Sequence, residues 1–108
     1  MAGNVFVAKL NADGSLNYST YLGGSVTQAP SGIRADAAGN AYVAGSTSST
    51  DFPISIGAFR RLPGPGFVSK INPTGTALVY STYVDAAPVA MALNANGSVY
   101  ITGIHKAC

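Results

Sequence analysis

Few residues of this 108-residue chain have side chains suited to acid–base or metal chemistry. There is one histidine, His105, there is no glutamate, and the acidic residues are Asp13, Asp36, Asp51 and Asp85. A catalytic triad needs a histidine beside both a nucleophile and an orienting acid, whereas these aspartates lie mostly in turn-like sequences. We therefore expect no catalytic residue, no metal site, no cofactor and no enzyme activity.

The only cysteine, Cys108, is the last residue. A single thiol forms neither an internal disulfide nor a cysteine-based zinc site. We expect an inert chain end, and a cross-link between two chains is the alternative.

Residues 36–40 (DAAGN) resemble a calcium-binding loop only superficially. An EF-hand needs alternating oxygen ligands and a distal bidentate glutamate, and this segment has neither. We interpret it as a hairpin turn in which Asp36 accepts hydrogen bonds from backbone amides and Gly39 adopts a positive φ. Residues 94–97 (NANG) keep the same turn chemistry without the charge.

The long segment 46–66 is the best candidate for a specific surface. Loops of this length are uncommon in compact domains and tend to be functional or to be linkers, and this one is too apolar for a free linker. Asp51, Phe52, Phe59, Arg60 and Arg61 are residue types that carry binding energy at interfaces, and we predict an interaction surface from them. The alternative is that the two phenylalanines cover a sheet edge while the arginines are solvated. We expect the segment to fold back over a sheet edge or an interface between repeats.

The elements that position these residues are expected to be β-strands. Only 9% of residues are charged, and no window shows the 3.6-residue apolar stripe of an amphipathic helix. A hydrophobic fraction of 47% with a net charge of +2 argues against disorder. The six Lys and Arg residues are scattered, so they do not form the basic patch of a nucleic-acid-binding protein.

Neither a membrane span nor a targeting signal is apparent. No apolar run reaches the roughly 20 residues that a membrane-spanning helix needs. The first residues show no basic and then apolar region of a signal peptide. The chain is therefore either cytosolic or a piece of a longer exported protein, and we favour the piece.

The sequence is one motif written twice. Residues 6–11 (FVAKLN) return as 67–72 (FVSKIN), residues 18–21 (YSTY) as 80–83, and residues 40–45 (NAYVAG) as 98–103 (SVYITG). This gives a first repeat at 5–45, a long loop at 46–66 and a second repeat at 67–103. Turn signals with Gly separate β-rich runs within each repeat. We predict about eight strands, four in each repeat: Val5–Leu10, Leu16–Leu22, 33–35, 41–44, 67–72, 77–84, 91–93 and 99–102.

Repetition also affects how single residues are interpreted. Lys9 and Lys70 occupy matching positions, and we expect them to be solvated or to guard a sheet edge rather than to bind a ligand. Six tyrosines recur by repeat position in the same way: Tyr18, Tyr21, Tyr42, Tyr80, Tyr83 and Tyr100. We expect them to pack, and a sugar-binding surface is the alternative.

These motifs resemble the bacterial β-propeller repeat of the SBBP type. The resemblance rests on FVAKLN, YSTYLGG, DAAGNAYVAG and TSSTDFP, which occur in this order within residues 6–53, and it extends to about residue 103. It implies an all-β fold of four-stranded antiparallel blades in a ring, with Ile33 and Met91 innermost and the Tyr-Ser-Thr-Tyr strands outermost. The chain then holds a half blade, a complete blade at about 33–84, and a second half blade.

Two blade-equivalents do not close a propeller, which needs about 4 to 8 blades. The chain is then a segment of a longer propeller, or copies assemble head to tail by completing each other's blades, or the two half-blades of one chain pair in a compact two-sheet body. The resemblance implies a non-enzymatic scaffold or binding module of an exported or surface-attached bacterial protein. A non-catalytic part of a polysaccharide-processing propeller enzyme, or a carbohydrate-binding propeller, is the alternative. Expected partners are other blades and a protein or carbohydrate ligand, without nucleic acid or membrane insertion.

Overall fold

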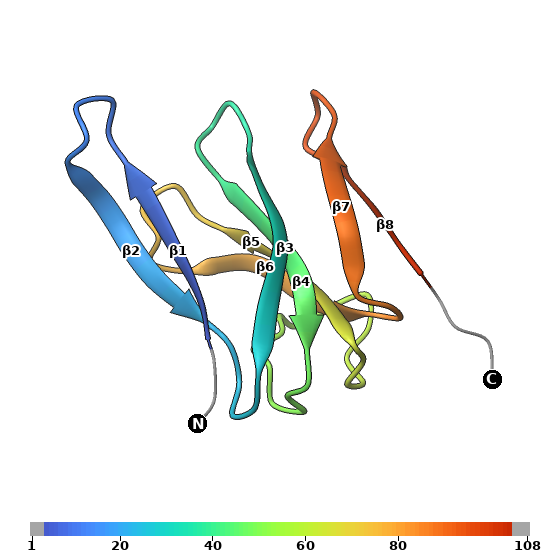
Figure 1. Cartoon of the computed structure of the whole chain (residues 1–108). Helices are drawn as coiled ribbons and strands as arrows, with labels where there is room; N and C mark the ends of the chain where they lie inside the picture. The colour runs from blue at the N-terminus through green and yellow to red at the C-terminus, as the bar shows by residue number, and fades with distance from the viewer. Residues whose placement is uncertain (1–3, 105–108) are drawn as a thin grey trace.

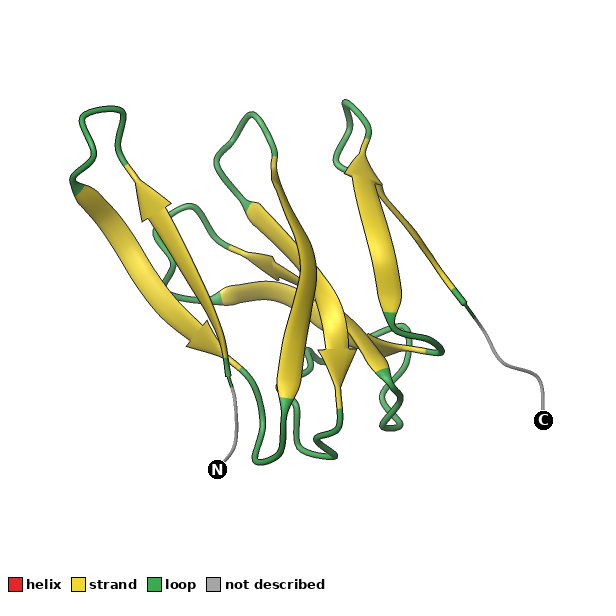
Figure 2. Ribbon diagram, in the orientation of Figure 1, coloured by secondary structure: helices red, strands yellow, loops and turns green. Residues whose placement is uncertain are grey.

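The structure, a computed structural model, describes residues 4–104 and consists there of eight β-strands joined by turns and loops (Figures 1 and 2). His105 and Cys108, on which two of the sequence interpretations rest, lie outside the described residues. The strands are β1 (Val5–Leu10), β2 (Leu16–Leu22), β3 (Gln28–Ala35), β4 (Ala41–Thr47), β5 (Gly66–Ile71), β6 (Leu78–Val84), β7 (Pro88–Leu93) and β8 (Val99–Gly103).

The strands form three separate antiparallel sheets. A four-stranded sheet in the order β3-β4-β5-β6 is the central blade, and the pairs β1-β2 and β7-β8 are the N-terminal and C-terminal half-blades. Figure 1 shows the two half-blades on opposite sides of the central blade. The predicted all-β fold is confirmed, and the sheets of two, four and two strands are consistent with the predicted half, complete and half blade.

The half-blades do not pair with each other, so one of the three alternatives, the compact two-sheet body, is not formed. The expected bounds of two strands were wrong. The strands expected at 33–35 and 91–93 are longer and begin at Gln28 and Pro88. The added residues lack an apolar alternation and include a proline in each copy, which β3 and β7 tolerate because each lies at an edge of its sheet.

The four short hairpin turns share one construction. In each, a glycine with positive φ donates its amide hydrogen to the carbonyl of the Asn or Asp three residues earlier, at 2.9–3.1 Å. Glycine adopts this backbone conformation without the steric cost that a Cβ would add. The pairs are Asn11 and Gly14, Asp36 and Gly39, Asn72 and Gly75, and Asn94 and Gly97.

The hydrophobic residues form two cores, one on each face of the central blade. Side chains alternate between the faces of a strand, so Val43 and Phe67 face the N-terminal half-blade while Tyr42 and Val68 face the C-terminal one. Each half-blade therefore has one face in a core and its other face exposed. These cores hold the three sheets together, because no backbone ladder joins one sheet to the next.

Candidate functional site

The segment between β4 and β5 folds onto the outer edge of the central blade, and we call residues 48–65 the strap. Ser55 donates its amide hydrogen to the carbonyl of Ser81 at 2.9 Å, and Tyr83 donates its own to the carbonyl of Arg60 at 3.2 Å. The strap thus satisfies backbone groups along β6 that an edge strand would otherwise expose. The expectation that this segment folds back over a sheet edge is confirmed.

Phe52 is a core residue of the strap rather than part of a surface. Its side chain is 3% exposed, and its ring centroid lies 4.4 Å from that of Phe67. Its amide donates to the hydroxyl of Tyr83 at 3.0 Å, and that hydroxyl donates to the carbonyl of Ser49 at 2.9 Å. Phe52 therefore anchors the strap to the blade and is not accessible to a partner.

The side chains of Asp51 and Arg60 both bind residues of neighbouring loops. The Asp51 carboxylate accepts hydrogen bonds from the amide of Ser25 at 2.8 Å and from its hydroxyl at 3.1 Å. These two bonds lower the pKa of Asp51. Arg60 forms an ion pair with Asp85 and donates to the carbonyl of Leu62 at 3.1 Å. These two charged residues connect the strap to the loops after β2 and β6.

Phe59 and Arg61 remain on the surface. Phe59 is 83% exposed, beside a groove along β6 that includes Ile56, which is 94% exposed. Arg61 is exposed as well. The five residues predicted as one interaction surface therefore do not form one surface. Phe52 lies in the core, Asp51 and Arg60 bind neighbouring loops, and Phe59 and Arg61 are exposed.

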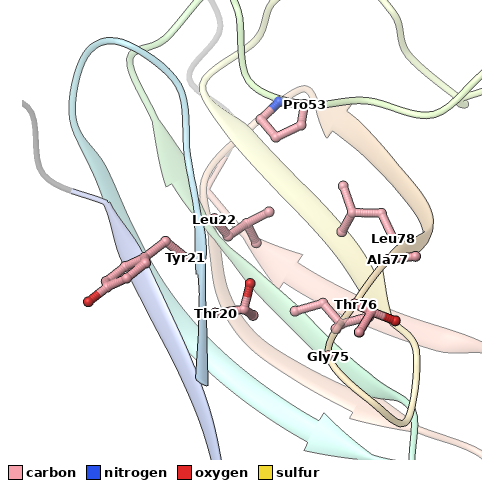
Figure 3. A pocket seen from close by; sticks show the side chains of 9 residues that line it. Thr20, Tyr21, Leu22, Pro53, Gly75, Thr76, Ala77 and Leu78 are labelled. Carbon is pink, nitrogen blue, oxygen red and sulfur yellow. The ribbon is translucent and has the colours of Figure 1, made fainter. Parts of the chain in front are cut away.

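A small pocket of about 180 Å³ lies where the N-terminal half-blade meets the central blade (Figure 3). Thr20, Leu22, Pro53 and Leu78 line it, and Figure 3 shows the ring of Tyr21 pointing away from it. No charged side chain lines this pocket. It therefore offers small apolar and hydroxyl surfaces.

The turn at Asp36 has the construction that the sequence predicted. The Asp36 carboxylate accepts from the amides of Ala38 and Asn40 at 3.1 and 2.9 Å and from the Tyr42 hydroxyl at 2.9 Å. Partial burial acts to raise the pKa of Asp36, but the hydrogen bonds from Asn40, Tyr42 and the backbone outweigh it, so the pKa is lowered. Among residues 4–104, no three His, Cys, Asp or Glu side chains gather where they could hold a metal ion.

Tyr42 occupies a closely packed site between the central blade and the C-terminal half-blade. It is 0% exposed, with Lys70 Nζ 5.2 Å from its ring centroid and Tyr80 in an edge-on contact at 6.5 Å. Beside its hydroxyl lies Gly97, where an added Cβ would be 3.2 Å from the oxygen. Burial and the neighbouring Tyr42 raise the pKa of Tyr80.

A second groove, of about 310 Å³, lies between β1 and β3. Apolar side chains from both strands line it, and Lys9 and Arg34 lie at its edge. The repeat is the one feature of the sequence that points to this groove, because each residue that lines it has a partner at the equivalent position of the second repeat. Its lining residues are Val7, Ala8, Lys9, Tyr18, Ile33, Arg34, Ala35, Gly39 and Ala41.

One segment of the chain matches a known family of repeats. Residues 17–53 match the family model described as SBBP, beta-propeller repeat. The search of curated proteins gave no match, and neither did the search of solved structures. The matched segment begins in β2 and ends in the strap, so the family's repeat is offset from the blade, which starts at β3.

A β-propeller repeat is a structural or binding module. The part of the chain that the structure covers holds no helix long and apolar enough to cross a membrane. The antiparallel sheets have the strand order expected of propeller blades. Residues 17–53 are thus similar to the SBBP β-propeller repeat, in agreement with the resemblance that the sequence motifs carry.

Proposed function

We propose that the chain is a non-enzymatic, blade-building scaffold or binding module of an exported bacterial protein. Its role is to supply one complete blade and two half-blades that join the blades on either side. The family match supports the propeller setting. The assignment to an exported protein rests on that family resemblance.

The observation that carries this proposal is the contrast in burial between repeat partners. Phe67 and Ile71 in β5 are 0% and 3% exposed, whereas their partners Phe6 and Leu10 in β1 are 69% and 63% exposed. Exposed apolar groups gathered on one face mark an interaction surface. The copies in β5 are buried because a neighbouring half-blade packs against them. We therefore infer that the exposed copies in β1 form the surface that packs against a further blade.

The same contrast argues for a packing role of the aromatic residues. Tyr100 is 62% exposed at the repeat position of Tyr42, which is 0% exposed. An exposed ring whose copy is buried between blades is better explained by a missing blade than by a sugar-binding platform. This favours the scaffold over the carbohydrate-binding alternative.

The carboxylates support the non-enzymatic part of the proposal, because each has a structural partner. Asp13 accepts hydrogen bonds from Ser15 in the first turn, and Asp85 pairs with Arg60. Asp36 and Asp51 hold the turn and the strap described above. Acids engaged in this way stabilise loops rather than form a general acid–base pair.

A tandem fusion tests the blade-building function. Three copies of the chain are joined so that residues 46–66 lie between Gly103 of one copy and Phe6 of the next, because Gly103 and Phe6 are the repeat partners of Gly45 and Phe67. We expect the fusion to unfold cooperatively and at higher denaturant concentration than a single copy, because neighbouring repeats stabilise one another through their interfaces.

The matched control is the same fusion with Phe6→Asp and Ile101→Asp in every copy. These charges would lie in the joints between copies, so the control should lose the gain in stability. A wild-type fusion that unfolds like a single copy would contradict the proposed function.

A further inference from the structure

We propose that the groove between β1 and β3 receives Tyr100 of a second copy of this chain, so that β8 of one chain continues the sheet at β1 of the next. This inference rests on the blade-building function proposed above and identifies the partner. The evidence is that the groove has the walls of the Tyr42 site but lacks its tyrosine.

The walls of the groove correspond residue by residue to the surroundings of Tyr42. Lys9, Tyr18 and Gly39 are the repeat partners of Lys70, Tyr80 and Gly97, which contact or flank the buried ring. The apolar wall corresponds as well. Val7, Ile33, Ala35 and Ala41 are the partners of Val68, Met91, Leu93 and Val99, which belong to the core around Tyr42.

The occupant that is missing from the groove is present elsewhere in the chain. Tyr100 is the repeat partner of Tyr42, and it is 62% exposed on β8. Figure 1 shows β8 and β1 on opposite sides of the central blade, so Tyr100 does not reach the groove of its own chain. A second copy brings the two together.

The central blade also defines the register of this joint. In the β4–β5 ladder Tyr42 lies opposite Lys70, and Gly45 lies opposite Phe67. The same register places Tyr100 opposite Lys9 and Gly103 opposite Phe6. At Gly45 an added Cβ would meet the backbone of Ala29 first and would also lie 3.0 Å from the ring of Phe67. The glycine at position 103 likewise leaves room for the Phe6 ring.

The two surfaces differ from each other, so the contact is head to tail and continues from chain to chain. Such heterologous contacts form closed rings when the rotation permits. Each chain contributes two blade-equivalents, and propellers contain about 4 to 8 blades. We therefore expect rings of two to four chains, with four, six or eight blades.

Light scattering coupled to size-exclusion chromatography tests the joint with two complementary variants. Tyr100→Ala removes the side chain that enters the groove, and Ala35→Trp fills the groove at an exposed position. We expect the wild type at two to four times the 10.9 kDa of one chain. Each variant should be monomeric, with association weakened at least about thirtyfold, as for a central interface residue.

Mixing the two variants gives the sharpest test. Tyr100→Ala keeps an open groove and Ala35→Trp keeps an intact Tyr100, so an equimolar mixture has one functional joint and should stop at a heterodimer. The matched control is Phe59→Ala, which removes an exposed ring on the outer rim and should leave the assembly unchanged. Circular dichroism of each variant establishes that the strands are retained.

A monomeric wild type would overturn this inference, and so would a Tyr100→Ala variant that assembles like the wild type. If the single copy is monomeric while the tandem fusion gains stability, the groove is filled by a neighbouring repeat of one longer chain, and the proposed function survives without the second copy. If the fusion also gains no stability, both proposals fail.

Discussion

The strand pairs β1-β2 and β5-β6 have the same local structure but different surroundings. Lys9 pairs with Tyr18 as Lys70 pairs with Tyr80, and in both pairs the register shifts directly after the lysine. Yet the exposed fraction of Tyr21 is 75%, and that of its partner Tyr83 is 1%. Strand pairing is thus a property of each repeat, whereas burial depends on the strap and blade that lie next to it.

The strand pairs β3-β4 and β7-β8, which form the other half of each blade, also have the same pairing but different burial. Both contain a register shift at the equivalent point, after Pro30 and after Pro88. Val43 is 2% exposed and its partner Ile101 is 38% exposed. A propeller repeat therefore determines its own hairpins but not its own core, which agrees with stability that arises from neighbouring units.

The largest expected effect is the difference in the free energy of unfolding between alanine substitutions at Phe67 and at Phe6. In the monomeric Tyr100→Ala background, Phe67→Ala should reduce the free energy of unfolding by about 3–5 kcal/mol, because it removes a fully buried ring. Phe6→Ala should change it by no more than about 0.5 kcal/mol. Urea unfolding of both variants measures the difference. Similar losses at the two positions would mean that the half-blade is already covered.

A smaller effect is expected at the tyrosine hydroxyl that holds the strap. Tyr83→Phe removes the acceptor of the Phe52 amide and the donor to the Ser49 carbonyl. We expect a loss of about 1–3 kcal/mol, typical of leaving buried backbone groups unpaired, and faster hydrogen exchange in residues 49–56. Tyr21→Phe is the control, since its ring is exposed and should contribute little. Unchanged exchange in the strap would contradict the anchoring role of Tyr83.

The smallest effect concerns pH and the two turns at Asp36 and Asn94. Because the pKa of Asp36 is lowered on folding, its stabilisation is complete above the ordinary value of 3.8 and is lost as the pH falls through the lowered value. Asp36→Asn copies the residue at position 94 and should reduce the drop in melting temperature between about pH 7 and about pH 3. Ala37→Asn, at an exposed turn position, serves as control. An unchanged drop would show that other carboxylates dominate the acid sensitivity.

The sequence predicted the hairpins well because they depend on local chemistry. Each turn needs a glycine at a positive φ and an Asn or Asp whose side chain binds nearby backbone amides, and these residues can be recognised without a structure. The starts of β3 and β7 were missed. Their first residues extend as strands because they pair with β4 and β8, although their own sequences show little β preference.

The candidate surface was predicted less well because its geometry depends on where the strap lies. Phe52 and Phe59 are seven residues apart in one apolar segment, and residue type alone does not distinguish them. Phe52 enters the core beside Phe67 and Tyr83, while Phe59 stays exposed at the rim. The groove at Lys9 was not predicted at all, since it is formed by strands of two different sheets.

By itself, the amino-acid sequence determined the repeat, the all-β fold and the hairpins, because glycine turns and β-forming residues act over a few neighbouring positions. Only the tertiary structure decided which copy of each repeated residue is buried. Two identical side chains differ in exposure when one has a strap or blade against it and the other does not. That difference arises from packing between sheets, which no local pattern encodes.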